Sequence, residues 1–186
     1  MKKVILFIAT ALVGVAAMAQ PKFAHVNLSE LIQLMPEADD ARTKLEASSL
    51  EAQETFEAMV EEYQAKYTTY SQKASTWTTA IRESKEKELM EIQQRIQDFD
   101  QSIQKELSEM QQMLMAPIQK KAMDTINALA KEGGYIYVFE ESSLLYIDKA
   151  LSTDLTPAAR KALNIPDGRT LETLSQELQA KAQMTE

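Results

Sequence analysis

The chain has 186 residues, of which 20 are Lys or Arg and 28 are Asp or Glu, so its formal net charge at pH 7 is −8. Such an acidic chain is a poor candidate for sequence-independent binding of nucleic acid, which depends on Lys and Arg at the phosphates. It contains no Cys, which excludes disulfides, thiolate metal sites and a Cys nucleophile. Only four Gly and many Glu, Gln, Lys, Leu, Met and Ala residues favour long helices in one domain.

Residues 1–19 have the pattern of a secretory signal peptide. Two Lys residues precede an apolar run over 4–16, and Ala17-Met18-Ala19 supplies a small-x-small cleavage pattern. The alternative, a membrane anchor, needs roughly 20 apolar residues, more than this run offers. A lipoprotein is excluded because lipid attachment needs a Cys. We therefore expect export and cleavage, which leaves 18 Lys and Arg against 28 Asp and Glu, a mature net charge of −10.

The mature chain opens with two short elements. Residues 22–26 are rich in strand formers, and a helix over 28–35 follows, with Asn27 or Ser29 as its cap. Pro36 then suits the first turn of a new helix.

The segment between Pro36 and Pro117 contains 80 residues without Gly or Pro. As one helix it would be about 120 Å long at about 1.5 Å per residue, so we expect it to fold back. The outgoing apolar positions advance by alternating steps of four and three, as in a heptad seam. They are Phe56, Val60, Tyr63, Tyr67, Tyr70, Ala74 and Trp77.

Folding the chain near residue 78 brings this stripe into register with a returning one. Seven facing pairs, from Ala74/Ile81 at the turn to Leu45/Met110, have residue numbers that sum to 155 or 156. The sequence therefore predicts an antiparallel hairpin over 37–116, with its tip near 75–79 and arms of roughly 60 Å. We expect Thr78 to cap the returning helix, and the tip to be more mobile than the base.

After the hairpin, the returning helix should continue past Pro117 to a stop at Gly133-Gly134. Residues 135–139 are the clearest strand, and we expect 144–147 to pair with them as a β-hairpin.

The remaining chain predicts one helix and one uncertain segment. Thr156 as cap and Pro157 at the first position indicate a helix to about Leu163. The extension over 164–186 forms either a short helix, at about 170–183, or a disordered tail.

Two or three short strands bury little surface on their own, yet they must anchor an arm of roughly 60 Å. We therefore expect several copies to join segments 20–36 and 117–163 into one oligomerisation body. Its expected residues are Phe23, Val26, Tyr135, Tyr137, Val138, Phe139, Leu144, Leu145 and Tyr146.

No motif indicates catalysis. His25 is the only His, which is too few for a His-centred metal cluster and leaves no Cys/His pair. Paired carboxylates such as Glu61-Glu62 lie on predicted helices, where acidic solvated faces are ordinary. Gly133-Gly134 precedes a strand rather than a helix, so no phosphate loop is present. We expect no enzyme, no metal and no cofactor.

Surface composition is the remaining functional signal. Residues 37–62 carry a net charge of −7, whereas residues 64–87 around the tip carry +3. Either ordinary charge scatter or contact with anionic partners explains this asymmetry. Aromatic rings gather in the same outer half, as the hairpin seam itself or as a grip for apolar partners. The candidate binding residues are Tyr63, Tyr67, Tyr70, Trp77, Lys66, Lys73, Arg82 and Lys85.

The order and spacing of these elements resemble the OmpH/Skp family of periplasmic chaperones over roughly residues 22–163. No single matching segment is specific, but their order is. The segments are 23–27, Met35-Pro36-Glu37, 83–89, 92–96, Ala116-Pro117-Ile118, 132–139, 144–148 and 154–156.

The resemblance implies a mainly α fold with a small β component (α+β), in which a long antiparallel coiled-coil hairpin projects from a small oligomeric β-body. It implies a soluble periplasmic homotrimer whose three arms surround a cavity and hold unfolded outer-membrane proteins without ATP. Two features depart from the family: well-studied members are basic, and 164–186 extends beyond the usual end.

Two other functions remain open. An exported coiled-coil spacer or adaptor of the cell envelope needs the same long hairpin, so composition does not separate it from a chaperone. Peripheral contact of the basic tip with membrane lipids or lipopolysaccharide is the third hypothesis.

Overall fold

The computed structural model describes residues 21–185, so the predicted signal peptide, residues 1–19, lies outside the described residues. Contacts within the chain define two units. The sheet unit comprises residues 21–31 and Ala122–Pro166, and the hairpin unit comprises Ile32–Lys121 and the segment from Asp167 onward. The elements are β1 (Lys22–Val26), α2 (Leu28–Leu34), α3 (Pro36–Lys73), η1 (Ala74–Thr76), α4 (Thr79–Gly133), β2 (Tyr135–Glu140), η2 (Glu141–Ser143), β3 (Ser152–Asp154), α5 (Thr156–Ala162) and α6 (Leu171–Thr185).

The sheet unit contains three parallel strands in the order β2-β1-β3. The central strand β1 pairs on both edges, so that His25 lies opposite Phe139 of β2 and Asp154 of β3. The predicted β-hairpin between 135–139 and 144–147 is therefore wrong. Because β2 and β3 lie on opposite edges of β1, the chain must cross from one edge to the other, and residues 144–151 make this crossing as a loop.

The core of the sheet unit gathers under β1. Ala24, His25 and Val26 are all buried, and the Nδ1 atom of His25 lies 2.8 Å from the Ser152 hydroxyl, which gives this buried ring a hydrogen-bond partner. The other buried apolar side chains come from α2, α4, α5 and their flanks. They are Leu31, Ala122, Ile126, Leu155, Ala159, Leu163 and Ile165.

Two helix starts in the sheet unit show how side-chain hydrogen bonds set the fold. Asn27 caps α2, because its side-chain oxygen accepts the Glu30 N–H at 2.9 Å. The expected cap of α5 by Thr156 is wrong: its N-cap residue is Leu155, which makes no side-chain cap. The Thr156 hydroxyl instead accepts the Asn27 N–H at 3.0 Å and so ties α5 to the start of α2.

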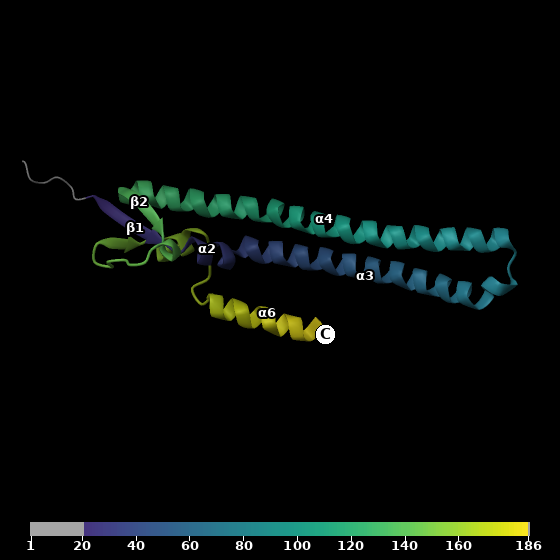
Figure 1. Ribbon diagram of the computed structural model, residues 1–186. Coiled ribbons are helices and arrows are strands. Elements are labelled where there is room, and N and C mark those ends of the chain that lie inside the picture. Colours follow the sequence, from purple (N-terminus) through teal and green to yellow (C-terminus); the bar gives the residue numbers. More distant parts are fainter. Residues whose placement is uncertain (1–20, 186) are drawn as a thin grey trace, which may run out of the picture. The chain divides into compact units, whose positions relative to one another are not determined.

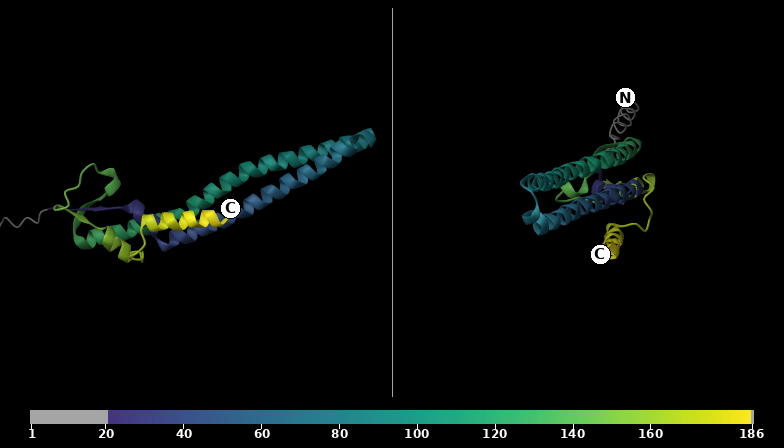
Figure 2. Two further views of the ribbon diagram at one scale, coloured as in Figure 1. Left: turned by 90° about the horizontal axis from the view of Figure 1, so that it is seen from below. Right: turned by 90° about the vertical axis from the view of Figure 1, so that its right-hand side faces the viewer.

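The hairpin unit consists mainly of α3 and α4, which run antiparallel and side by side (Figures 1 and 2). The chain reverses between Lys73 and Thr79, through η1. Thr78 accepts the Ile81 N–H through its hydroxyl at 3.4 Å, and α4 then continues past Pro117 without a break. The prediction of a mainly helical α+β chain with a long antiparallel hairpin is confirmed.

Contacts between the arms give the register of the hairpin. Lys66 pairs with Glu88, the Tyr70 hydroxyl donates to Glu86, and Arg95 pairs with Glu62 at 2.9 Å. The residue numbers in these pairs sum to 154, 156 and 157, close to the register expected from the two stripes.

The seam between the arms is thinner than the sequence suggested. Between residues 42 and 117 only Ile92 is buried, and the other seam side chains are half-buried or exposed. Tyr67, which the sequence places in this seam, is 53% exposed. Lys66 turns toward the opposite arm instead, because Glu88 lies there to receive its ammonium group. Among the described helices, none is long and apolar enough to cross a membrane.

We predict that Leu31→Ala, at a fully buried position, lowers the free energy of unfolding by about 2–5 kcal/mol, because it removes apolar burial and leaves a cavity. Leu50→Ala, at a half-exposed position on α3, should change it by less than about 0.5 kcal/mol. Urea unfolding followed by circular dichroism measures both. Equal effects of the two substitutions would contradict the assigned core.

Candidate functional site

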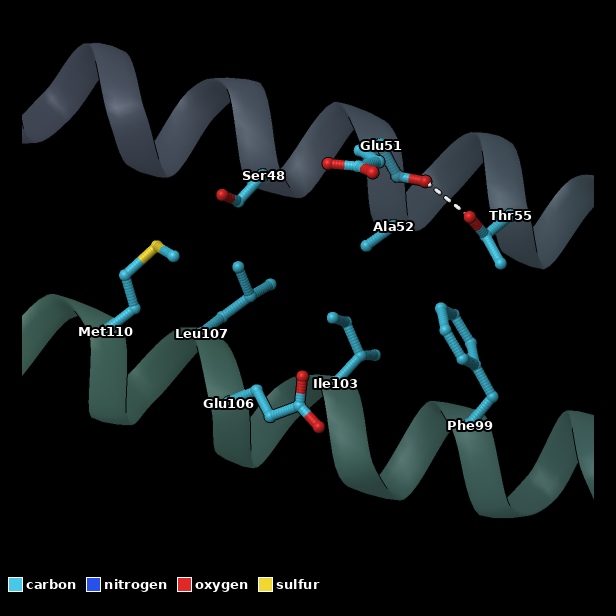
Figure 3. A pocket seen from close by; sticks show the side chains of 9 residues that line it. All are labelled: Ser48, Glu51, Ala52, Thr55, Phe99, Ile103, Glu106, Leu107 and Met110. Carbon is cyan, nitrogen blue, oxygen red and sulfur yellow. Dashed lines mark hydrogen bonds between the residues drawn. The ribbon is translucent and has the colours of Figure 1, made fainter.

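An open apolar hollow lies between α3 and α4, along residues 48–55 of α3 and 99–110 of α4. Large side chains of α4 face small side chains of α3, which do not fill the space between the helices (Figure 3). The hollow has a volume of about 280 Å³. The residues from α4 are Phe99, Ile103, Glu106, Leu107 and Met110, and those from α3 are Ser48, Glu51, Ala52 and Thr55.

Sequence reasoning missed this hollow, although its signal is present in the chain. Ala52 and Ile103 form one of the seven facing pairs predicted above, but that pairing says nothing of how little side-chain volume lies on the α3 side. Thr55 also turns its hydroxyl back to the Glu51 carbonyl at 2.8 Å, so it satisfies its own helix rather than the opposite arm.

The four candidate aromatic residues form two ring pairs in the outer half of the arm. Tyr63 and Tyr67 stack with centroids 6.1 Å apart and planes 15° apart. Tyr70 meets Trp77 edge-on, with centroids 6.0 Å apart. Since Tyr67 is more than half exposed, the first pair offers a ring face to solvent.

Two of the four candidate cations are held by one carboxylate. Lys66 and Lys85 both bind Glu88, with Lys85 Nζ at 2.8 Å from Oε2. Hydrogen bonds from Lys66 and then Lys85 lower the pKa of Glu88 to about 2. Nearby, the Tyr70 hydroxyl donates to Glu86 at 2.5 Å, and this bond raises the pKa of Tyr70.

The other two candidate cations are open to solvent. Within residues 21–185, Lys73 and Arg82 make no ion pair, and both side chains are exposed. The predicted basic tip therefore divides into an internal pair, Lys66 and Lys85, and an outward pair, Lys73 and Arg82.

The candidate residues of the oligomerisation body also divide into buried and exposed side chains. Val26 is buried within the protomer, and Tyr135, Val138 and Leu144 are half-buried. The exposed members share one side of the sheet or the crossing loop. They are Tyr137, Phe139, Leu145 and Tyr146, and Leu145 is fully exposed at 107%.

Strand register explains the aromatic side of the sheet. Phe23 lies opposite Tyr137, and His25 lies opposite Phe139, so these four side chains share one face. The rings of Phe23 and Tyr137 stack at 6.3 Å, and those of Tyr137 and Phe139 lie 5.9 Å apart. A single protomer leaves much of this aromatic face uncovered.

No metal chemistry is indicated in the part of the chain that the structure describes, because no cluster of three or more His, Asp or Glu side chains there could hold an ion.

Comparison with known proteins places these features in a family. The family described as outer membrane protein (OmpH-like) matches residues 22–163. The chaperone protein Skp of Yersinia enterocolitica is 25% identical over 150 residues, which cover 78% of this chain and 88% of that protein. The crystal structure of a candidate outer membrane chaperone (OmpH-like) from Caulobacter crescentus superimposes with a TM-score of 0.70 at 14% identity, covering 81% of this chain and 88% of that one. This last likeness concerns the fold alone.

We predict that the ion pairs of Glu88 with Lys66 and Lys85 stabilise the hairpin above about pH 4.5. This stabilisation should be lost as the pH falls toward about 2, because the folded-state pKa of Glu88 lies below its ordinary value of 4.5. Carboxyl chemical shifts in an NMR titration measure that pKa directly. Replacing both lysines, Lys66→Met with Lys85→Met, should return it toward 4.5. A Glu88 that titrates near 4.5 in the unmodified protein would contradict the assigned pairing.

Proposed function

The chain belongs to the OmpH-like family, and from this premise we propose that it is an ATP-independent holdase chaperone of the periplasm. In this function it binds unfolded outer-membrane proteins between helical arms and prevents their aggregation. The proposal requires no catalytic residue and no cofactor.

The observation that carries the proposal is the half-open seam of the hairpin. These arms leave an apolar hollow beside Ile103 and a Tyr67 ring that is 53% exposed, surfaces that a structural spacer does not require. Such surfaces suit weak binding of extended apolar segments without sequence preference, because the hydrophobic effect is not directional. A holdase must release its client, so weak and variable contact suits this function.

A homotrimer is part of the proposal. The exposed aromatic face of the sheet and the exposed Leu145 and Tyr146 of the crossing loop supply apolar surface that a single chain leaves in water. Contiguous exposed apolar residues of this kind are typical of subunit interfaces. Joining three copies would cover this surface and place three arms around a common cavity.

The outward pair, Lys73 and Arg82, supports electrostatic contact at the tip. An acidic client segment would meet two cations that no described carboxylate neutralises. The same pair makes anionic lipid headgroups or lipopolysaccharide a second candidate contact, which flotation with anionic vesicles tests separately.

The test of the proposed function is aggregation of a urea-unfolded outer-membrane β-barrel after dilution, followed by light scattering. We expect a threefold excess of subunits to suppress the scattering, without ATP. Sedimentation of the chain without client should give three subunits. Unchanged scattering would contradict the holdase and favour an envelope spacer.

We further predict that Lys73→Glu with Arg82→Glu weakens binding of an acidic client by about threefold or more at low salt, with the difference lost at high salt. The matched control is Lys44→Glu with Lys131→Glu, which makes the same change in net charge at two exposed positions outside residues 64–87. Fluorescence anisotropy of a labelled client measures both. Equal weakening by the two variants would show that net charge, and not the tip, governs binding.

A further inference from the structure

The segment that follows the family match, from Asp167 onward, folds onto the hairpin unit. It forms α6, which runs beside the first part of α3 and in the same direction (Figure 2). Its start is well defined locally, because Thr170 and Thr173 exchange hydrogen bonds between hydroxyl and backbone at 2.9 and 3.1 Å. The chain thus builds a complete helix where the family match has already ended at residue 163.

An arginine anchors this segment to α3. The Arg169 guanidinium donates to the Asp39 carboxylate at 2.5 Å and lies 3.6 Å from the Glu177 carboxylate of α6. Its side chain is only 17% exposed, so water screens this pair less than it screens the ion pairs along the arms. Arg169 therefore joins the linker, α3 and α6.

The same Asp39 is part of the bend at which the arm begins. Helix α2 ends at Leu34, Met35 is extended, and α3 starts at Pro36. In a continuous helix, the N–H of Glu37, four residues later, would donate to the Gln33 carbonyl. Both Arg42 terminal nitrogens donate to this carbonyl at 3.2 Å, and Arg42 also pairs with Asp39.

An apolar contact accompanies the ion pairs. Leu174, in the first turn of α6, is buried at 6% exposure. Leu171 and Leu178 lie on the same stripe but are about two-fifths exposed, and with Gln33 they line a shallow hollow. The helix is thus held near its start, by the burial of Leu174 and the ion pairs of Arg169.

We propose that residues 167–185 are a strap that holds the bend between α2 and α3 through the chain of contacts Gln33–Arg42–Asp39–Arg169. Closed, the strap restrains the root of the arm. Open, it removes the Arg169 link from Asp39 and lets the arm swing further. If the proposed function holds, the strap limits the size of the client that the arms admit. The restraint on the bend is present whether or not a client is bound.

Hydrogen–deuterium exchange of the mature protein, without client, tests the strap. We expect Arg169→Gln to speed exchange of the amides in 36–48 by about two- to fivefold, the range that loss of one such ion pair produces. Truncation after Pro166 should have at least the same effect. The matched control is Arg95→Gln, which removes the pair with Glu62 and should act in the outer half of the arm instead.

Two results would overturn the strap. One is exchange in 36–48 that neither Arg169→Gln nor the truncation changes. The other is a lack of protection across 171–185 in the unmodified protein, which would mean that α6 does not stay folded on α3. Because no client is present, these results do not depend on the holdase assay, and a failed holdase assay would leave them unchanged.

Discussion

The hairpin unit depends on the single apolar stripe that joins its two very long helices. A helix in a two-helix hairpin can bury only one stripe, and here almost all of that stripe stays half-exposed, with Ile92 as its buried point. Ion pairs between the arms, such as Lys66–Glu88 and Glu62–Arg95, fix the register but add little free energy, because they lie at the surface. The hairpin is therefore specific in register and weak in packing.

Weak packing of the arm determines what the remaining chain must do. The sheet unit pairs β1 on both edges but leaves an aromatic face around Tyr137 in water, and we propose that further copies of the chain cover it. The root of the arm is the other place where restraint is needed, and Asp39 joins two arginines there. The sheet unit and the start of α3 are thus held by specific contacts, whereas the outer half of the arm has looser apolar ones.

Much of the fold followed from local patterns in the sequence. The heptad spacing of two stripes predicted the hairpin, because side-chain periodicity in a helix is a local property. The strand pairing was wrong because turn residues after 139 indicate a change of direction but not which strand the chain joins next. Strand β3 joins β1, which lies more than 120 residues earlier. The Thr156 hydroxyl was misassigned for the same reason, since its partner Asn27 is distant in sequence.

The sequence predicted which residues belong to the candidate site but not how they pair. The rings and cations of the outer half were named, but only the structure separates Lys66 and Lys85, bound to Glu88, from the outward Lys73 and Arg82. The link between Asp39 and Arg169 spans 130 residues and leaves no periodic signal. The hollow beside Ile103 depends on missing volume, which a pattern of apolar positions does not record.

The central claim is that clients lie against the open stripe of the arms. Photo-crosslinking from single sites measures this directly, with a photoreactive residue at Tyr67, whose ring is exposed beside the seam, and at Glu57, an exposed acidic position of α3. The account predicts abundant crosslinks to an unfolded outer-membrane barrel from position 67 and few from position 57. Equal crosslinking from both positions, or none from either, would contradict it.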